Sequence, residues 1–166
     1  MRIIVDGYNL IRRSHELSAL DRQDLELGRE GLLGLLSPYQ RLKGHRITVV
    51  FDGREGGFPL RRQEQRGNLT VIFSRKGELA DEVIKQLSSP GTVVITSDRE
   101  LQSASERAGA IALEAEAFLM KLEEAAYRLG KGLEEEEEEP PPAKRKGAAR
   151  RPPKGVRRKE EVLRKL

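Results

Sequence analysis

The chain has 166 residues, no cysteine and two histidines, and its formal net charge is +4. This length is sufficient for one domain with its own hydrophobic core. The absence of cysteine excludes disulfides, zinc sites built on thiolates and thiol catalysis, so any bound metal is expected to be held by oxygen ligands. No stretch has the form of a signal peptide or the length that crosses a membrane, and we therefore expect a cytoplasmic protein with no membrane partner.

Charge is distributed unevenly along the chain. Residues 1–133 carry 20 Lys and Arg against 19 Asp and Glu, six consecutive Glu follow at 134–139, and residues 144–166 carry 11 basic against two acidic residues. We expect a folded domain over 1–130 and a charged, disordered tail over 131–166, because a Glu run, a proline linker and a basic arm bury too little apolar surface to fold. Val162 to Leu166 are a candidate for a turn of helix formed on a partner.

The first predicted element is a strand, Ile3-Ile4-Val5, closed by Asp6-Gly7. A short β-branched run of this kind is typical of a strand buried on both faces. Functional groups of open α/β sheets lie at the carboxyl ends of the strands, so Asp6 is a candidate site residue, and Asn9 is a second one. The alternative is structural, since Asp-Gly is a common turn and Asp or Asn often caps the following helix.

Helical and strand patterns then alternate. After a short helix and turn within residues 10–20, amphipathic helices are predicted over 25–42, from about 78 to 87, over 99–108 and over 115–129. Strands are predicted at 47–51, 69–73, 92–96 and 110–113, and residues 53–68 are expected to form a loop. Five strands alternating with helices predict an α/β fold with a central parallel sheet, in the order 3-2-1-4-5. That order places Asp6 beside Asp98, at the end of the fourth strand.

Acidic side chains gather at this predicted edge of the sheet. Asp6, Asp98 and an acid of the helix from 78 would repel one another unless a cation were bound between them. Carboxylates suit Mg²⁺ or Mn²⁺, and such sites hydrolyse phosphodiester bonds. The helical pattern alone does not choose between Asp81 and Glu82. The alternatives are again structural: Ser97 to Glu100 fit a capping box, Asp81 fits a solvated helix face and Asp52 fits a turn.

Four motifs together resemble the YacP-like branch of the NYN domain family, which belongs to the PIN-like nucleases. They are Val5-Asp6-Gly7-Tyr8-Asn9-Leu10-Ile11, Val49-Val50-Phe51-Asp52-Gly53, Gly77-Glu78-Leu79-Ala80-Asp81 and Val94-Ile95-Thr96-Ser97-Asp98. The resemblance covers about residues 1–129 and implies a PIN-like three-layer fold. The motifs that bind nucleotide cofactors, G-x-x-x-x-G-K-[ST] and G-x-G-x-x-G after the first strand, are both missing from the sequence.

The resemblance implies a metal-dependent endoribonuclease with RNA as substrate and Mg²⁺ or Mn²⁺ as cofactor, acting on mRNA or on RNA at the ribosome. It makes Asp6, Asp81 and Asp98 the catalytic, metal-binding carboxylates and favours Asp81 over Glu82. Asn9, Ser97 and Asp52 become supporting residues. The alternative function is a non-catalytic RNA-binding or ribosome-binding protein that uses the basic tail.

Basic residues outside these motifs are candidates for RNA binding, because clustered Lys and Arg attract phosphate backbones. They are Arg61, Arg62 and Arg66 in the loop after the second strand, and Lys144, Arg145, Lys146, Arg150 and Arg151 in the tail. The alternatives are a solvated loop and a tail that only increases solubility. The Glu run either lies on the basic arm when RNA is absent or serves as a spacer.

Overall fold

The computed structural model describes residues 1–53, 59–130 and 153–166. Within them the strands are β1 (Arg2–Asp6), β2 (Arg46–Phe51), β3 (Arg62–Arg66), β4 (Leu69–Phe73), β5 (Thr92–Ile95) and β6 (Ile111–Leu113). The helices are α1 (Gly7–Arg13), α2 (His15–Gln23), α3 (Leu25–Lys43), α4 (Ala80–Leu87), α5 (Arg99–Arg107), α6 (Ala115–Gly130) and α7 (Lys154–Lys165). None of these helices combines the length and the apolar character needed to cross a membrane.

The strands form one sheet in the order β3-β4-β2-β1-β5-β6. Five neighbouring strands, β4, β2, β1, β5 and β6, are parallel, which confirms the predicted α/β fold and its strand order. β1 lies in the centre, with Val5 paired to Val49 of β2 and to Ile95 of β5. The carboxyl end of β1 therefore meets the ends of both neighbours, and this is the edge at which the predicted acids lie.

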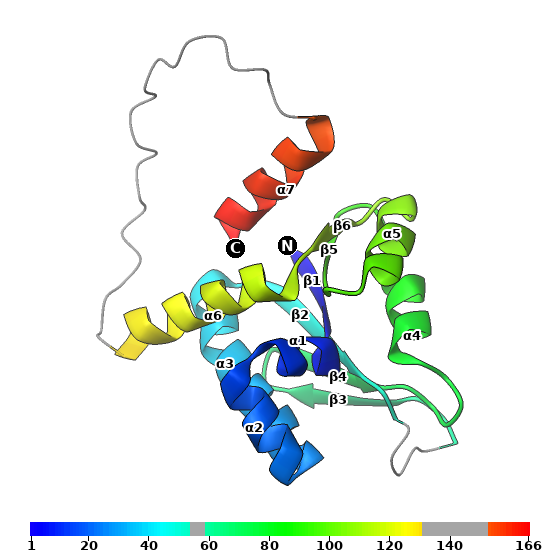
Figure 1. Cartoon of the computed structure of the whole chain (residues 1–166), viewed down its shortest axis with the longest axis vertical. Coiled ribbons are helices and arrows are strands. Elements are labelled where there is room, and N and C mark those ends of the chain that lie inside the picture. The colour runs from blue at the N-terminus through cyan, green and yellow to red at the C-terminus, as the bar shows by residue number, and fades with distance from the viewer. Residues whose placement is uncertain (54–58, 131–152) are drawn as a thin grey trace.

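Helices cover both faces of the sheet and make three layers (Figure 1). Alternate residues of β1 face opposite sides: Ile3 and Val5 belong to the larger core, whereas Ile4 belongs to the smaller one. The larger core contains residues from α1, α2, α3 and α6, and the smaller core contains residues from α4 and α5. Apolar side chains buried on both faces explain why β1 reads as a continuous apolar run.

β3 lies where the sequence predicted a loop, and the prediction of a loop over 53–68 is wrong for this part. β3 pairs antiparallel with β4, from Arg62 opposite Phe73 to Arg66 opposite Leu69. Its sequence, Arg-Gln-Glu-Gln-Arg, has no apolar residue because it is an edge strand that is largely exposed. The sequence does contain a turn signal between the two strands of this hairpin, the pair Gly67-Asn68. In the structure Gly67 has a φ of 60°, which favours glycine.

The end of the chain differs from the disordered tail that the sequence predicted. Residues 131–152 lie outside the described residues, but α7 follows them and contacts β6. Val162 and Leu163 pack against the larger core, Leu166 is 1% exposed, and the Tyr39 hydroxyl donates to the Leu166 carbonyl oxygen at 2.9 Å. The composition of this segment is charged, yet its apolar residues recur at spacings of three and four and make one apolar face. That face packs on the protein's own core.

We predict that shortening Leu166 destabilises the whole domain. Leu166→Ala removes a buried side chain and should lower the free energy of unfolding by about 2 kcal/mol, the lower end for such substitutions because the backbone just after the last turn of α7 relaxes easily. Val156→Ala, on an exposed position of the same helix, is the control and should change it by less than about 0.5 kcal/mol. Urea unfolding monitored by circular dichroism measures both. Equal values for the two variants would show that α7 is not part of the core.

Candidate active site

Asp6 is the last residue of β1 and is buried, with 8% of its surface exposed. Its Oδ1 accepts a hydrogen bond from the Asn9 backbone N–H at 3.3 Å, so it caps α1. Its Oδ2 accepts one from the Thr96 hydroxyl at 3.0 Å. The turn after Asp6 requires glycine, because a Cβ on Gly7 would lie 2.3 Å from the Phe51 ring. The sequence thus fixes this carboxylate at the edge of the sheet.

Asp98 and Asp81 complete an acidic group at this edge. Asp98 is exposed, and its Oδ1 caps α5 by accepting from the Leu101 N–H at 2.9 Å. Its own N–H donates to the hydroxyl of Thr96, the residue that also holds Asp6. Asp81 lies half-buried in the first turn of α4. Asp6 therefore acts as a helix cap, as its structural alternative predicted. The predicted capping box of Ser97 to Glu100 is wrong, because Asp98 and not Ser97 is the cap of α5. Capping also orients both carboxylates.

Burial and mutual repulsion perturb these acids. Burial is the main reason why the pKa of Asp6 is raised from 3.8 to about 6. The hydrogen bonds from Thr96 and Asn9 lower this pKa, and the charges of Asp81 and Asp98 raise it further. The pKa of Asp81 is also raised, first by burial and then by the charge of Asp98, with smaller effects from Asp52 and Glu100. These three predicted acids are electrostatically coupled, and coupled acids with raised pKa values are characteristic of functional sites.

Asn9 and Ser97 hold the backbone around the acids. The Asn9 side-chain oxygen accepts from the Ser97 N–H at 2.8 Å and so joins the start of α1 to the turn before α5. The Ser97 hydroxyl donates to Glu116 at 2.8 Å and accepts from the Ala115 N–H at 3.2 Å. The Ser97 hydroxyl therefore contacts the start of α6 rather than the three predicted catalytic acids.

Asp52 and Arg61 belong to a network that holds the loop leading to α4. The Ser74 hydroxyl donates to the Glu78 carbonyl oxygen at 2.8 Å and lies 3.3 Å from Asp52 Oδ1, an alternative acceptor for its one proton. Glu78 is 6% exposed and forms an ion pair with Arg61 through both carboxylate oxygens. This pairing, with a hydrogen bond from the Arg75 N–H, lowers the pKa of Glu78 to about 2. The network fixes residues 74–79, which position Asp81.

The other predicted RNA-binding arginines also form ion pairs. Arg62 pairs with Glu64 at 2.7 Å, and Arg66 pairs with Glu30 at 3.2 Å and Glu64 at 3.4 Å. The strand register places Arg62 at the carboxyl end of β4 and Arg66 at its amino end, away from the acids. The basic tail residues Lys144, Arg145, Lys146, Arg150 and Arg151 lie outside the described residues.

A second group of side chains, which the sequence did not predict, begins with Tyr8, two residues after Asp6. Tyr8 packs edge-on against Phe51, with ring centroids 5.2 Å apart. Arg12 lies over the Tyr8 ring at 6.0 Å, and Arg29 donates to the Tyr8 hydroxyl at 3.1 Å. We call Tyr8, Arg12 and Arg29 the cationic-aromatic group. Its only sequence signal was the spacing of four between Tyr8 and Arg12, which puts them on one face of a helix.

The acids suit a hard cation without forming a closed cage for one. In the parts of the chain that the structure describes, no three acidic or histidine side chains make a ready metal-binding group. The available ligands are carboxylate oxygens, and each oxygen of Asp6 accepts one hydrogen bond and keeps capacity for another ligand. Mg²⁺ commonly binds through one or two carboxylates, with water and substrate phosphate completing its shell. The residues present therefore fit such an ion.

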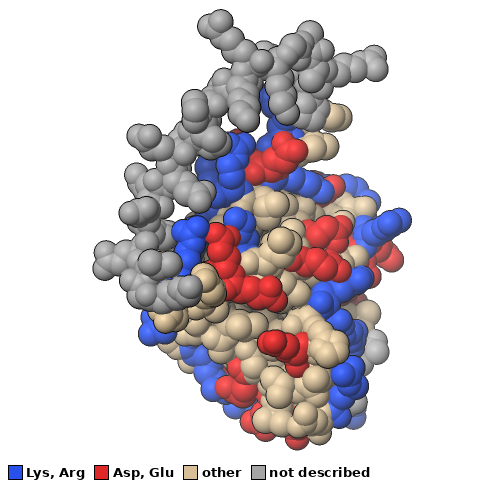
Figure 2. Space-filling model, turned by 60° about the vertical axis from the view of Figure 1, so that its left-hand side comes forward, with Lys and Arg blue, Asp and Glu red and all other residues tan. Residues whose placement is uncertain are grey.

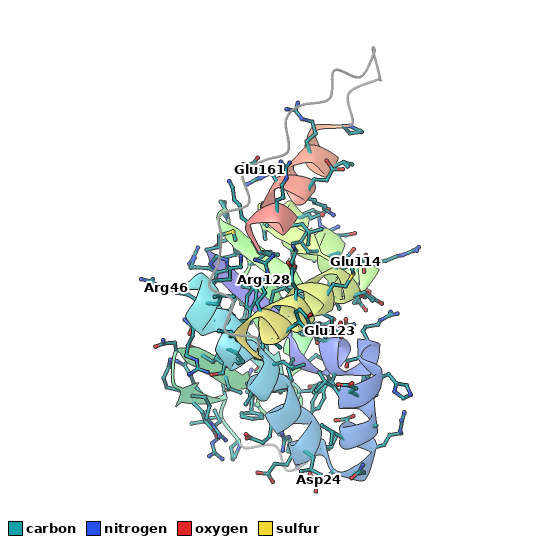
Figure 3. The ribbon with its side chains drawn as sticks, turned by 90° about the vertical axis from the view of Figure 1, so that its left-hand side faces the viewer. Asp24, Arg46, Glu114, Glu123, Arg128 and Glu161 are labelled. Carbon is teal, nitrogen blue, oxygen red and sulfur yellow. The ribbon has the colours of Figure 1, made fainter. Side chains whose placement is uncertain are left out.

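We predict that Asp6→Asn stabilises the metal-free protein in a pH-dependent manner. A raised pKa means that the folded state is stabilised when Asp6 is protonated and loses this stability as pH rises from about 4 to 6. Since a change of one in pKa corresponds to about 1.4 kcal/mol, the neutral amide should add up to about 3 kcal/mol above pH 6 and little near pH 4. Asp24→Asn, at the exposed cap of α3 labelled in Figure 3, is the control and should have a small effect throughout. Urea unfolding in EDTA between pH 4.5 and 8 tests this, and a destabilised Asp6→Asn protein at pH 8 would contradict it.

Comparison with known proteins identifies the family. The model of the YacP-like NYN domain matches residues 3–163, extending past residue 129 into α7. An uncharacterized protein YacP from Bacillus subtilis (strain 168) is 31% identical over 135 residues, which cover 76% of this chain and 78% of that protein. Two crystal structures of Rae1 (YacP) from Bacillus subtilis, one of them of a point mutant, have a TM-score of 0.68 and 29% identity. They cover 80% and, for the mutant, 79% of this chain, and 79% of each Rae1 chain is covered. The chain belongs to the YacP-like NYN domain family, a branch of the PIN-like nucleases.

Proposed function

We propose that this protein is a metal-dependent endoribonuclease that hydrolyses phosphodiester bonds at Asp6, Asp81 and Asp98. The observation that carries the proposal is the electrostatic coupling of these three acids at the carboxyl edge of the sheet. A group of repelling carboxylates persists in a fold when a bound cation offsets the repulsion. Membership of a PIN-like nuclease family supports the same chemistry.

Mg²⁺ or Mn²⁺ is the proposed cofactor, as is general for NYN and PIN-like nucleases, and the three acids would hold it. A bound divalent cation supplies Lewis-acid activation of the scissile phosphate and offsets its negative charge. The contribution of the neighbouring residues is to orient Asp6 and to oppose the effect of burial on its pKa. Thr96 and the Asn9 N–H do so by donating to its two oxygens.

The cationic-aromatic group, whose Tyr8 follows Asp6 by two residues, is a proposed RNA contact. Arg12 is exposed, and Tyr8 offers an aromatic ring of the kind on which bases stack. Figure 2 shows a face on which acidic and basic side chains are interspersed, rather than one broad basic area. For the face that Figure 2 shows, we therefore assign phosphate binding to small groups of basic side chains. Arg62 and Arg66 stay candidates for more distant contacts.

We predict that Asp81 and Glu82, neighbours that the sequence alone did not distinguish, differ sharply in cleavage. Asp81→Asn keeps the shape of the side chain but removes charge needed for the cation, so cleavage of a single-stranded RNA in Mn²⁺ should fall by about a hundredfold or more. Glu82→Gln, at an exposed position, should keep activity within a few-fold. EDTA should abolish wild-type cleavage.

The outcomes of this comparison separate the candidate functions. Equal loss in both variants would indicate disturbance of α4 rather than of a metal site. RNA binding without cleavage by the wild-type protein in either Mg²⁺ or Mn²⁺ would favour the non-catalytic RNA-binding alternative.

We predict that Arg12→Gln weakens RNA binding more than it slows chemistry. The KM for RNA should rise several-fold with little change in kcat, because the side chain positions the backbone without touching the reacting atoms. The slope of log affinity against log salt should become shallower by about 0.7 for each RNA phosphate that the variant no longer binds. Arg22→Gln, an exposed arginine on α2, is the matched control. A decrease in kcat alone for Arg12→Gln would contradict a positioning role.

A further inference from the structure

A groove of about 440 Å³ lies at the amino ends of the strands, at the edge of the sheet opposite the acids. Arg2, Arg46, Thr48 and Thr70 are among the residues that line it. Arg2 and Asp6 lie at the two ends of β1, which separates them by roughly 13 Å at 3.3 Å per residue. The groove is therefore separate from the proposed catalytic site, and none of its features is explained by that site.

The register of the sheet places two arginines side by side at this groove. Arg2 of β1 and Arg46 of β2 are direct partners in the parallel pairing. Ile4 lies two residues after Arg2 on β1, and Val50 lies four residues after Arg46 on β2. Both face the smaller core. Because side chains alternate along a strand, both arginines project from the same face of the sheet as that core. Figure 3 shows the Arg46 side chain extending outward from the end of β2.

The two guanidinium groups are not neutralised within the described residues. Arg2 donates to the Ser89 hydroxyl at 3.2 Å, which leaves its charge uncompensated. Of the described residues that line the groove, none is Asp or Glu. Like charges directly opposite each other on neighbouring strands are destabilising, and an anion bound between them removes the cost. Guanidinium groups bind the oxygens of phosphate through paired hydrogen bonds.

The rest of the groove combines polar side chains with apolar ones such as Ile4 and Leu87, and it is large enough for more than an inorganic ion. Thr48 and Thr70 are partners on β2 and β4, and Gln65 and Asn68 line the groove beside them. Hydroxyl and amide groups of this kind fix the orientation of a small polar ligand by hydrogen bonds. The volume lies within the usual range for small-molecule sites, about 300 to 1,000 Å³.

We propose that this groove binds the phosphate group of a nucleotide, with Arg2 and Arg46 holding the phosphate and the polar side chains contacting the nucleoside. The phosphate belongs either to a free mononucleotide or to an RNA strand. The proposal does not depend on the endoribonuclease activity, because it uses neither the acids nor a metal.

Titration calorimetry of the full chain in EDTA tests the proposal, since the acids then have no cation. The probes are AMP, adenosine, and RNA hexanucleotides with and without a 5′-phosphate. The Kd for AMP or for a hexanucleotide should rise about tenfold or more in Arg2→Gln and Arg46→Gln, as expected when a charge-assisted hydrogen bond is removed. Arg41→Gln, an exposed arginine on α3 outside the groove, should leave it unchanged, and adenosine should bind at least tenfold more weakly than AMP.

The source of the phosphate follows from which probe depends on the two arginines. If Arg2→Gln and Arg46→Gln weaken the binding of AMP, the groove binds a free nucleotide or the end of a strand. If they weaken the binding of both hexanucleotides but not of AMP, the groove binds the RNA backbone. The proposal is overturned if none of the probes binds at millimolar concentration, or if binding is the same in the Arg2→Gln/Arg46→Gln double variant. Thermal unfolding of that variant verifies the fold, and both side chains are exposed, so no loss of structure is expected.

Discussion

The burial of the Asp6 carboxylate beside two other acids is the constraint on which the rest of this site depends. A carboxylate loses its hydration when it is buried, and among the described residues two hydrogen-bond donors replace it, the Thr96 hydroxyl and the Asn9 N–H. The charges of Asp81 and Asp98 increase the cost of ionisation. Stability and function are therefore opposed at this position, which is common where a site is prepared for a cation.

The parallel sheet explains how distant segments supply this site. β1 lies between β2 and β5, so Asp6, Asp52 and Thr96 lie at the carboxyl ends of three adjacent strands. Asp81 reaches the same edge from the first turn of α4, behind the loop that Glu78 and Arg61 hold in place. Arg61, which the sequence predicts to bind RNA, forms an ion pair with the buried Glu78 and so also helps to hold the loop before α4.

The sequence predicted the features that arise from regular burial. Apolar runs located the five parallel strands, and their alternation with helices determined the order that brings Asp6 toward Asp98. Capping and catalysis were treated as alternatives for these acids, whereas the structure shows that capping leaves the carboxylates at the site edge. β3 was missed because an exposed edge strand needs no apolar residue. Of α7, the sequence predicted only a turn over Val162 to Leu166, and on a partner rather than on the protein's own core, because its apolar face has few residues in a highly charged segment. The cationic-aromatic group and the paired arginines of the groove depend on tertiary contacts and strand register, which local patterns do not contain.

The central claim is that Asp6, Asp81 and Asp98 together form a divalent cation site. Anomalous diffraction from crystals soaked in Mn²⁺ at pH 8, where Asp6 is ionised, tests it most directly. We expect an anomalous peak within coordination distance, about 2.2 Å, of an oxygen of at least two of these three carboxylates, or linked to them through water. Absence of a peak at this edge at millimolar Mn²⁺, or a peak held only by other residues, would contradict the claim.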